Sequence, residues 1–324
     1  MDTIYLLRGT EIKRDQNTLV VVTEDRQKRR LPVEALRHVV VLGATRLNSE
    51  VATFLGKHGV RLSFLDYYGH FSGSLEPARH HHSGSVHLAQ AKMILNDASR
   101  LTMASRILEA GACNMLRNLK YYLYRGNHDL KKPIHFLEQQ LSTKRADSIE
   151  GLMGQEGSFR KNYYAAWGKI NPALTILKRT RRPPTDRINS LLSFCNGLIY
   201  SACSQAIAQT HLDPTLSFIH APTQARNSLA LDLAEVFKPL VADRVIFSMI
   251  NKEMLDDCCY QEEAGVCLLN PNGRERVLRE FRERMDNTKI AGEVGWRRIF
   301  LKEAFAIEAH LLELSEYEPF MVKA

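Results

Sequence analysis

The chain has 324 residues, of which 44% are hydrophobic and 25% are charged. This composition is ordinary for a globular protein with room for two domains. Lysine and arginine exceed aspartate and glutamate by eight and the pI is near 9.2, which fits a polyanionic partner without requiring one. The longest apolar runs, such as residues 39–42, are far too short to span a bilayer. The first residues lack the basic region of a secretory signal, so we expect a cytoplasmic protein.

The first part of the chain predicts a small β domain. Runs rich in β-branched and aromatic residues, separated by turn residues, occur at 4–7, 18–22, 38–42 and 60–65. One helix is expected between them, at about 48–57, with Asn48 or Ser49 as its cap and Gly59 as its stop. We place this domain at residues 1–76.

A change of composition near Gly73 predicts the domain boundary. Glycine, serine and proline become frequent, and residues 80–82 are three successive histidines. No acidic or cysteine cluster accompanies these histidines, so an exposed loop is favoured over a metal site. We expect a linker at residues 77–88.

From about Val86 the apolar residues recur at three- and four-residue spacing, which predicts a larger helical domain at residues 89–324. No strand is expected in it. The breaks between its helices are expected at Pro172, Pro214, Pro239 and Pro271. The later helices are predicted at 152–170, 186–210, 228–237, 274–287 and 296–314. The sequence therefore predicts an α+β protein with a small N-terminal β domain and a larger all-α C-terminal domain.

The six cysteines include no Cys-x-x-Cys pair. The adjacent Cys258 and Cys259 are not the usual spacing of a zinc site or of a disulfide. We expect reduced thiols throughout.

Two carboxylates and a histidine lie within the otherwise apolar stretch 216–239. Asp232 and Glu235 are three residues apart on one predicted helix, so their like charges repel unless a cation lies between them or one is protonated. His220 precedes that helix on an irregular segment that could fold back over the acidic face. The alternative is structural: Glu235 pairs with Lys238, Asp232 interacts with the helix dipole, and His220 is a core histidine.

A third acidic residue, Glu156, lies between glycines in the segment GQEG at 154–157. Glycine lets a ligand approach the backbone closely, but it is also common where helices begin. Tyr163, Tyr164 and Trp167 follow at helical spacing. These aromatic residues could stack on bases, but a core position is favoured.

Taken together, these segments resemble the CRISPR-associated integrase of spacer acquisition, CRISPR-associated protein one. The resemblance covers essentially the full chain. It is carried by GQEG at 154–157, YYAAW at 163–167, PPTDRINSLLSF at 183–194, IH at 219–220 and SLALDLAEVFKP at 228–239.

This resemblance implies a divalent-metal site in the helical domain. The metal ligands of the family fall on Glu156, His220 and Glu235, and Asp232 is the accompanying acid, so these four are the candidate catalytic residues. It also implies a homodimer, whose contacts with itself and with partners are expected in the β domain. The dimer would assemble with the small CRISPR-associated protein two on double-stranded DNA, namely a prespacer and the CRISPR repeat.

Two carboxylates and an imidazole suit Mg²⁺ or Mn²⁺ better than structural zinc. Such an ion can stabilise charge on a phosphate, so one site can serve strand transfer or hydrolysis. Two alternatives stay open: a metal-dependent DNA endonuclease without an integration role, and a non-catalytic DNA-binding scaffold. The candidate DNA-binding residues are Lys178, Arg179, Arg181, Arg182 and Arg226. The arginines of 274–284 and the pair at 144–145 are weaker candidates.

Overall fold

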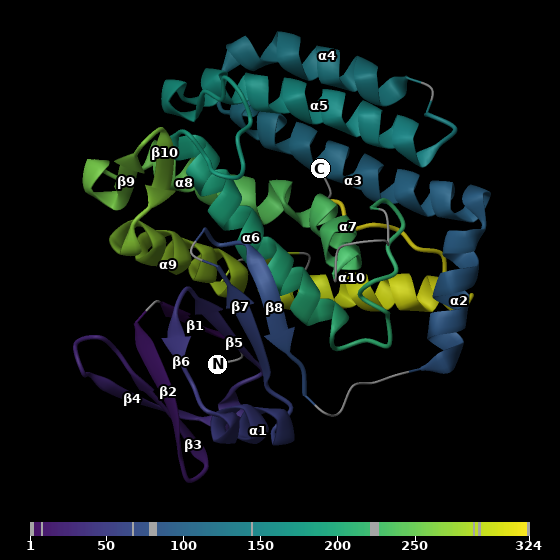
Figure 1. Ribbon diagram of the computed structural model, residues 1–324. Coiled ribbons are helices and arrows are strands. Elements are labelled where there is room, and N and C mark those ends of the chain that lie inside the picture. The colour runs from purple at the N-terminus through teal and green to yellow at the C-terminus, as the bar shows by residue number, and fades with distance from the viewer. Residues whose placement is uncertain are drawn as a thin grey trace.

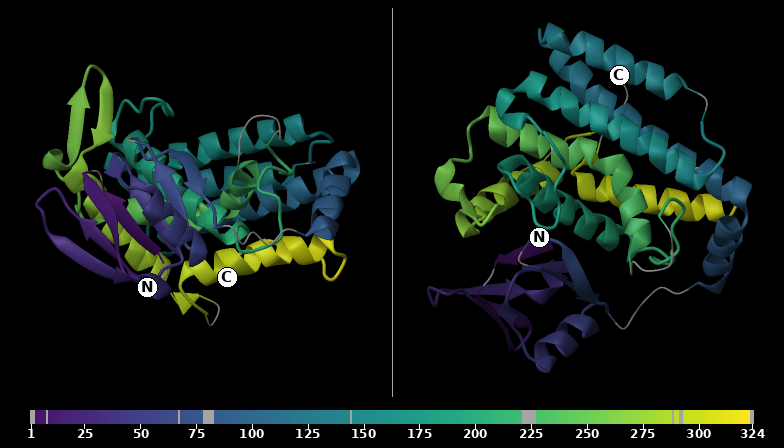
Figure 2. Two further views of the ribbon diagram at one scale, coloured as in Figure 1. Left: turned by 60° about the horizontal axis from the view of Figure 1, so that its bottom comes forward. Right: turned by 45° about the horizontal axis from the view of Figure 1, so that its top comes forward.

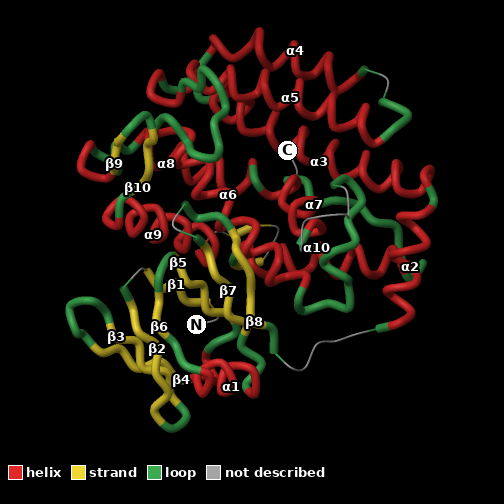
Figure 3. Tube along the Cα trace, in the orientation of Figure 1, coloured by secondary structure: helices red, strands yellow, loops and turns green. Residues whose placement is uncertain are grey.

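The computed structural model describes residues 3–7, 9–66, 68–77, 83–143, 145–220, 227–287, 289–290 and 293–322. Figure 1 shows two parts, with the N-terminal strands on one side and the helices on the other. Figure 3 shows the same division by secondary structure. Within the described part of the chain, no helix has both the length and the apolar character needed to cross a membrane.

Two four-stranded sheets and one helix make up the N-terminal part. The first sheet has the order β1-β5-β7-β8, in which β8 is antiparallel to the other three strands; the second has the order β4-β3-β2-β6. The bounds are β1 (Thr3–Leu7), β2 (Thr10–Asp15), β3 (Thr18–Val22), β4 (Lys28–Pro32), β5 (His38–Leu42), β6 (Thr45–Arg46), α1 (Ser49–Lys57), β7 (Arg61–Leu65) and β8 (Phe71–Leu75). Asn48 is the cap of α1, because its side chain accepts the Val51 N–H.

Strand β5 is a continuous apolar run because the first sheet is covered on both faces. Val40 and Leu42 belong to the core that it shares with the helical part, whereas Val39 and Val41 pack in a second core with α1 and the other sheet. The predicted strand bounds 18–22 and 38–42 agree with the structure. Strands β2, β4, β6 and β8 are additional to the prediction.

The C-terminal part is mainly helical. Its helices are α2 (Gly84–Leu95), α3 (Asp97–Tyr124), α4 (Lys131–Ser142), α5 (Ile149–Ile170), α6 (Arg187–Ile207), α7 (Ser228–Phe237), α8 (Arg244–Asn251), α9 (Pro271–Asn287) and α10 (Trp296–Leu311). Short 3₁₀ helices lie at η1 (Val33–Ala35), η2 (His128–Leu130), η3 (Pro172–Leu174) and η5 (Asp257–Cys259). Helices α3, α4 and α5 pack side by side, and α3 and α6 both pack against α7 (Figure 1).

Helix α2 begins at Gly84, inside the range predicted as linker. Ser83 is its cap, since the Ser83 hydroxyl accepts the Val86 N–H at 3.5 Å. Residues 78–82, which include the three histidines at 80–82, lie outside the described residues.

The expectation that no strand follows Val86 is wrong. An antiparallel hairpin of β9 (Tyr260–Glu263) and β10 (Val266–Leu269) projects from the helical part (Figure 2, left), and a second short pair joins β11 (Lys289–Ile290) to β12 (Glu293–Val294). The first hairpin closes through Ala264 and Gly265, both at positive φ, as two-residue hairpin turns require. Strand β9 is mostly exposed and polar, so its sequence lacks the apolar pattern that identifies a strand.

Pro239 does not end the helical run, although a break between helices was expected there. It begins a π-helical segment, η4 (Pro239–Asp243), that joins α7 to α8 directly. The Asp243 N–H donates to the Lys238 carbonyl at 3.0 Å. Proline has no N–H to donate to the preceding turn, and the chain stays helical past it through the wider i→i−5 hydrogen bond of a π-helix. Pro271 likewise lies at the start of α9 and not in a break.

The C-terminal segment folds back onto α10 and α7. The Glu303 carboxyl accepts hydrogen bonds from the Tyr317 hydroxyl at 2.6 Å and from the Phe320 N–H at 3.1 Å. The Phe320 ring stacks near that of Phe237, which ends α7. Burial raises the pKa of Glu303 to about 7. The proton on this carboxyl therefore stabilises the folded state.

We expect Glu303→Gln, which mimics the protonated form, to remove a pH dependence of stability. The contribution of Glu303 is complete below its ordinary pKa of 4.5 and is lost as the pH rises through about 7. Relative to the wild type, the variant should therefore gain about 3 kcal/mol of unfolding free energy between pH 4.5 and pH 8. Urea unfolding across this range measures the difference. Parallel curves for the two proteins would contradict the prediction.

Candidate active site

Asp232 holds the segment before α7 in place. The residue is fully buried, and its Oδ2 accepts the N–H groups of Phe218 at 2.6 Å and Ile219 at 2.9 Å. Its Oδ1 accepts a hydrogen bond from His220 Nδ1 at 2.6 Å. This carboxylate assigns the proton of the neutral imidazole to Nδ1, which leaves the lone pair of Nε2 as a ligand.

Glu235 lies one turn further along α7 and is neutralised by two cations. Its Oε1 accepts Lys238 Nζ at 2.7 Å, and its Oε2 pairs with Arg160. Burial alone would raise the pKa of Glu235, but the charges of Arg160 and Lys238 outweigh burial and lower it to about 2. The pair with Lys238 that the structural alternative predicted is therefore present, and the carboxylate is ionised.

Arg160 forms ion pairs with both Glu156 and Glu235. Arg160 follows Glu156 by four residues on α5, so the two side chains lie on one helix face. Its Nε pairs with Glu156 and its Nη2 with Glu235. Carboxylates from α5 and α7 thus converge on one guanidinium. This cation lies between Glu156 and Glu235, whereas the spacing on α7 indicated a cation between Asp232 and Glu235.

These three side chains line a cavity of about 200 Å³ between α3, α4, α5 and α7. Its lining also includes the ion pair of Glu109 and Arg145. Apolar side chains complete the wall, namely Leu108, Met115, Leu152 and Phe159. A polar ligand in this cavity would meet both carboxylates.

Gly111 permits the close approach of α3 to α7 behind Glu235. A Cβ at residue 111 would lie 2.8 Å from the Glu235 carbonyl oxygen. Any other residue there would push the helices apart and displace Glu235 from Arg160.

The predicted metal ligands are only partly assembled. Glu156 and Glu235 share one cation, whereas His220 is held at Asp232. In the described ranges, three side chains of the metal-ligating types His, Cys, Asp and Glu bring their ligand atoms within 4.8 Å of one another at another place, namely Asp256, Cys258 and Cys259. The donor set of two carboxylates and one imidazole still fits a hard divalent cation, because the carboxylates already bind a positive group. The assignment of Glu156, His220 and Glu235 as metal ligands stays a prediction.

The candidate DNA-binding residues divide into two kinds. Lys178, Arg181 and Arg182 are exposed. The Arg179 guanidinium donates to Asn189 Oδ1 at 2.8 Å and to Ser193 Oγ at 3.2 Å. It therefore anchors the segment 178–182, called the basic loop below, to α6. Arg226 lies outside the described residues, as does Lys144.

Several weaker candidates have structural roles. Tyr163 and Trp167 are completely buried, which confirms the core assignment. Asn189 is also buried, and its side-chain Oδ1 accepts the Thr180 N–H at 3.1 Å, which is a structural role for this amide. In the 274–284 segment, three arginine side chains donate to backbone carbonyls, namely Arg274 to Leu269, Arg282 to Tyr5 and Arg284 to Leu240. Arg279 is exposed.

Sequence reasoning assigned no role to Arg160 or Asp243. The four-residue spacing from Glu156 was a local signal for Arg160. Asp243 is buried in η4, where it accepts the Tyr163 hydroxyl at 2.9 Å, and burial raises its pKa to about 7. No local pattern marks Asp243, because its burial depends on how η4 packs against α5.

Comparison with known proteins identifies the family. The profile of CRISPR associated protein Cas1 matches residues 4–283. This chain belongs to the Cas1 family. A relative from Thermodesulfovibrio yellowstonii, named CRISPR-associated endonuclease Cas1 2, is 35% identical over 327 residues, with 98% of each chain covered. The earlier resemblance is therefore confirmed.

Solved structures confirm the Cas1 fold. A Cas1 protein from Thermotoga maritima has a TM-score of 0.86 at 29% identity, with 97% of this chain and 98% of that chain covered. A Cas6-RT-Cas1–Cas2 complex matches at a TM-score of 0.83 and 19% identity, and covers 99% of this chain and 36% of that chain. The N-terminal β region followed by a mainly helical part is thus the Cas1 arrangement, as the predicted α+β class required.

Proposed function

We propose that this chain is a metal-dependent DNA integrase and endonuclease of CRISPR adaptation. The observation that carries the proposal is the convergence of Glu156 and Glu235 on one cation, with His220 held by Asp232, which lies one helical turn before Glu235 on α7. Membership of the Cas1 family, several of whose relatives are named endonucleases, supports a nucleic acid as the substrate.

Glu156, His220 and Glu235 would hold Mg²⁺ or Mn²⁺. When bound, the ion supplies positive charge that stabilises the negative charge developing on the phosphate oxygens. Asp232 orients the imidazole and fixes its proton on Nδ1. Arg160 competes for the same carboxylate oxygens, and its guanidinium becomes available to a phosphate once it leaves them.

The proposed reaction is a transesterification. The 3′-hydroxyl of a prespacer attacks a phosphorus of the CRISPR repeat, a new P–O bond forms, and the repeat strand leaves with its own 3′-hydroxyl. Water as the nucleophile would give hydrolysis at the same site. Glu156, His220 and Glu235 would have the same roles in strand transfer and in hydrolysis.

A strand-transfer assay tests this proposal. The purified chain, its small Cas2-type partner and Mn²⁺ are mixed with a supercoiled plasmid carrying the repeat and a labelled prespacer. We expect the label to become joined to the plasmid, and a prespacer ending in a 3′-dideoxynucleotide to give no joined product. Nicked plasmid without label in both reactions would instead favour an endonuclease with no integration role.

The partner assignments belong to this proposal. We place the homodimer and partner contacts in the β domain of residues 1–76, joined by a linker at 77–88 to the catalytic domain at 89–324. A solved Cas6-RT-Cas1–Cas2 complex shares the fold, which supports a Cas2-type partner. Light scattering should give twice the chain mass of 36.9 kDa, and a mass of one chain would contradict the dimer.

The basic loop provides a prediction for DNA binding. We expect Arg181→Ala/Arg182→Ala to weaken binding and to make the slope of log K against log salt shallower by about 2, since each exposed arginine contacts one phosphate. Titrations at several salt concentrations measure the slope. Lys131→Ala/Lys132→Ala removes the same charge from an exposed site at the start of α4 and should leave the slope unchanged. Equal slopes for wild type and the arginine variant would exclude this contact.

A further inference from the structure

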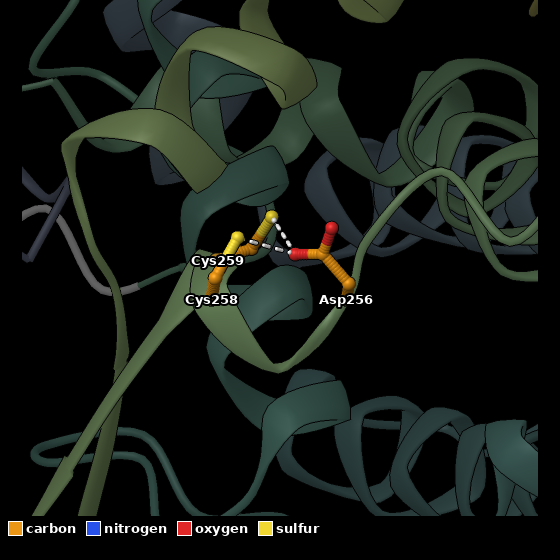
Figure 4. A group of neighbouring side chains, drawn as sticks. All are labelled: Asp256, Cys258 and Cys259. Atoms are coloured by element: carbon orange, nitrogen blue, oxygen red, sulfur yellow. Dashed lines mark hydrogen bonds between the residues drawn. The ribbon is translucent and has the colours of Figure 1, made fainter.

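The loop before the β9–β10 hairpin carries a cluster of metal-binding side chains separate from the candidate active site. Cys258 Sγ and Cys259 Sγ both donate to Asp256 Oδ1, at 2.8 and 3.1 Å. Figure 4 shows the two sulfur atoms directed at this one oxygen. The three ligand atoms lie within 4.8 Å of one another. Asp256 and Cys258 are exposed and Cys259 is buried, so an ion can enter from solvent.

The backbone of the cysteine pair is fixed on the first turn of α9. Asn270 donates its side-chain amide to the Cys258 carbonyl at 2.6 Å and its N–H to the Cys259 carbonyl at 3.0 Å. Gly273 lets the helix approach this closely, because a Cβ there would lie 2.3 Å from the Cys259 carbonyl oxygen. The two thiols are therefore pre-organised by contacts that do not involve their sulfur atoms.

Arg276 and Asn272 place polar groups beside the cluster. Arg276 Nη1 donates to Asp256 Oδ2 at 3.2 Å and to the Met254 carbonyl at 3.1 Å. The Asn272 side-chain amide faces Cys258 Sγ at 3.7 Å, in position to stabilise a thiolate.

We propose that Asp256, Cys258 and Cys259 form a binding site for one thiophilic divalent cation of the Zn²⁺ class, with water completing the coordination. Two S–metal bonds would form as the two thiol protons pass to solvent. The two thiolates balance the charge of the ion, and Arg276 balances Asp256. Zinc bonds of 2.0 to 2.3 Å place tetrahedral ligand atoms roughly 3.5 Å apart, so the thiols and carboxylate need to separate only slightly.

The cysteine spacing alone did not reveal this site. Adjacent cysteines are an unusual zinc pattern, and the expectation of reduced thiols rested on this spacing and on the absence of a Cys-x-x-Cys pair. The third ligand, Asp256, joins the cluster because the short helix η5 turns both sulfur atoms toward it. Sulfur ligands select different metals from the oxygen and nitrogen donors of the candidate active site, so the two sites can be tested independently.

Bound metal would fix the base of the projecting hairpin. Strand β10 is already attached to the start of α6, because the Cys267 N–H donates to the Pro184 carbonyl at 2.9 Å and the Leu269 N–H to Ser190 Oγ at 3.1 Å. Strand β9 follows the cysteine pair directly. A cation there would tie β9 to the α9 end of the molecule.

Titration of the reduced full-length chain with Cd²⁺ alone, without oxygen, tests the proposal. We expect one equivalent to produce the ultraviolet charge-transfer band of cadmium–thiolate bonds. Cys258→Ser should abolish the band, and because Cys258 is exposed this change leaves the core intact. Cys113→Ser, a matched change at a thiol of α3, should retain the band, and so should Glu156→Ala.

Two further measurements complete the test. Asp256→Asn should weaken Cd²⁺ binding about tenfold or more, and Zn²⁺ should raise the melting temperature of the wild type but not that of Cys258→Ser. No band at one equivalent, or a band that survives in both Cys258→Ser and Cys259→Ser, would overturn the proposal.

Discussion

Glu156→Ala is expected to abolish metal-dependent strand transfer while leaving the protein folded. The carboxylate would hold the divalent cation, and its loss removes several kcal/mol of charge stabilisation in the transition state. Since 1.36 kcal/mol is a factor of ten in rate, we expect a fall of at least about 100-fold. Its side chain is 24% exposed, and Arg160 keeps Glu235 as a partner, so the cost in stability should be about 1 kcal/mol or less. Initial rates of prespacer joining with Mn²⁺ measure the effect.

A matched control is available on the same helix. Glu150 lies in the first turn of α5 and is exposed, so Glu150→Ala makes the same chemical change away from the cavity and should join prespacer at the wild-type rate. His220→Ala should behave like Glu156→Ala. Normal joining by both Glu156→Ala and His220→Ala, with substitutions in the basic loop inactive, would point to a non-catalytic scaffold.

Glu235→Ala should instead destabilise the fold strongly. Glu235 and Lys238 are each 7% exposed, and Glu235 neutralises both Lys238 and Arg160. Without this carboxylate, Lys238 would remain as a buried cation with no ion-pair partner among the described residues. Breaking a buried pair in this way costs about 3–5 kcal/mol. Urea unfolding of the variant against Glu156→Ala should show the difference, because both variants lose one carboxylate of the same site.

A double variant separates the unpaired charge from the loss of packing. Glu235→Gln/Lys238→Met removes both charges and keeps similar volume, and Arg160 retains Glu156. We expect this variant to recover most of the stability that Glu235→Ala loses, because a neutral pair leaves no buried ion. An equal loss of unfolding free energy in the two variants would show that side-chain packing, and not charge, stabilises α7 at Glu235. Neither variant should join prespacer.

Local patterns predicted the elements that carry the site. Helix α7 has the predicted bounds 228–237 because an apolar stripe fixed its period over ten residues. Strand β5 was equally clear, as a run that is buried on both faces. The β9–β10 hairpin was missed because its outer strand is polar and its turn residues gave the only signal. Such patterns extend over a few residues. They predict a helix or strand correctly where its buried residues recur with the period of that element.

The sequence alone determined the Cas1 resemblance, the α+β class and the identity of the candidate ligands, because motif order and periodicity are written along the chain. Only the tertiary structure showed that the Asp232 carboxylate accepts backbone N–H groups of the segment 218–220. It also showed that Arg160 forms ion pairs with both Glu156 and Glu235, and that Asp256 lies beside two thiols. Each of these depends on which side chains the packed helices bring within hydrogen-bonding distance. That proximity is set by the whole fold, since a carboxylate finds its partner only after its helix is placed.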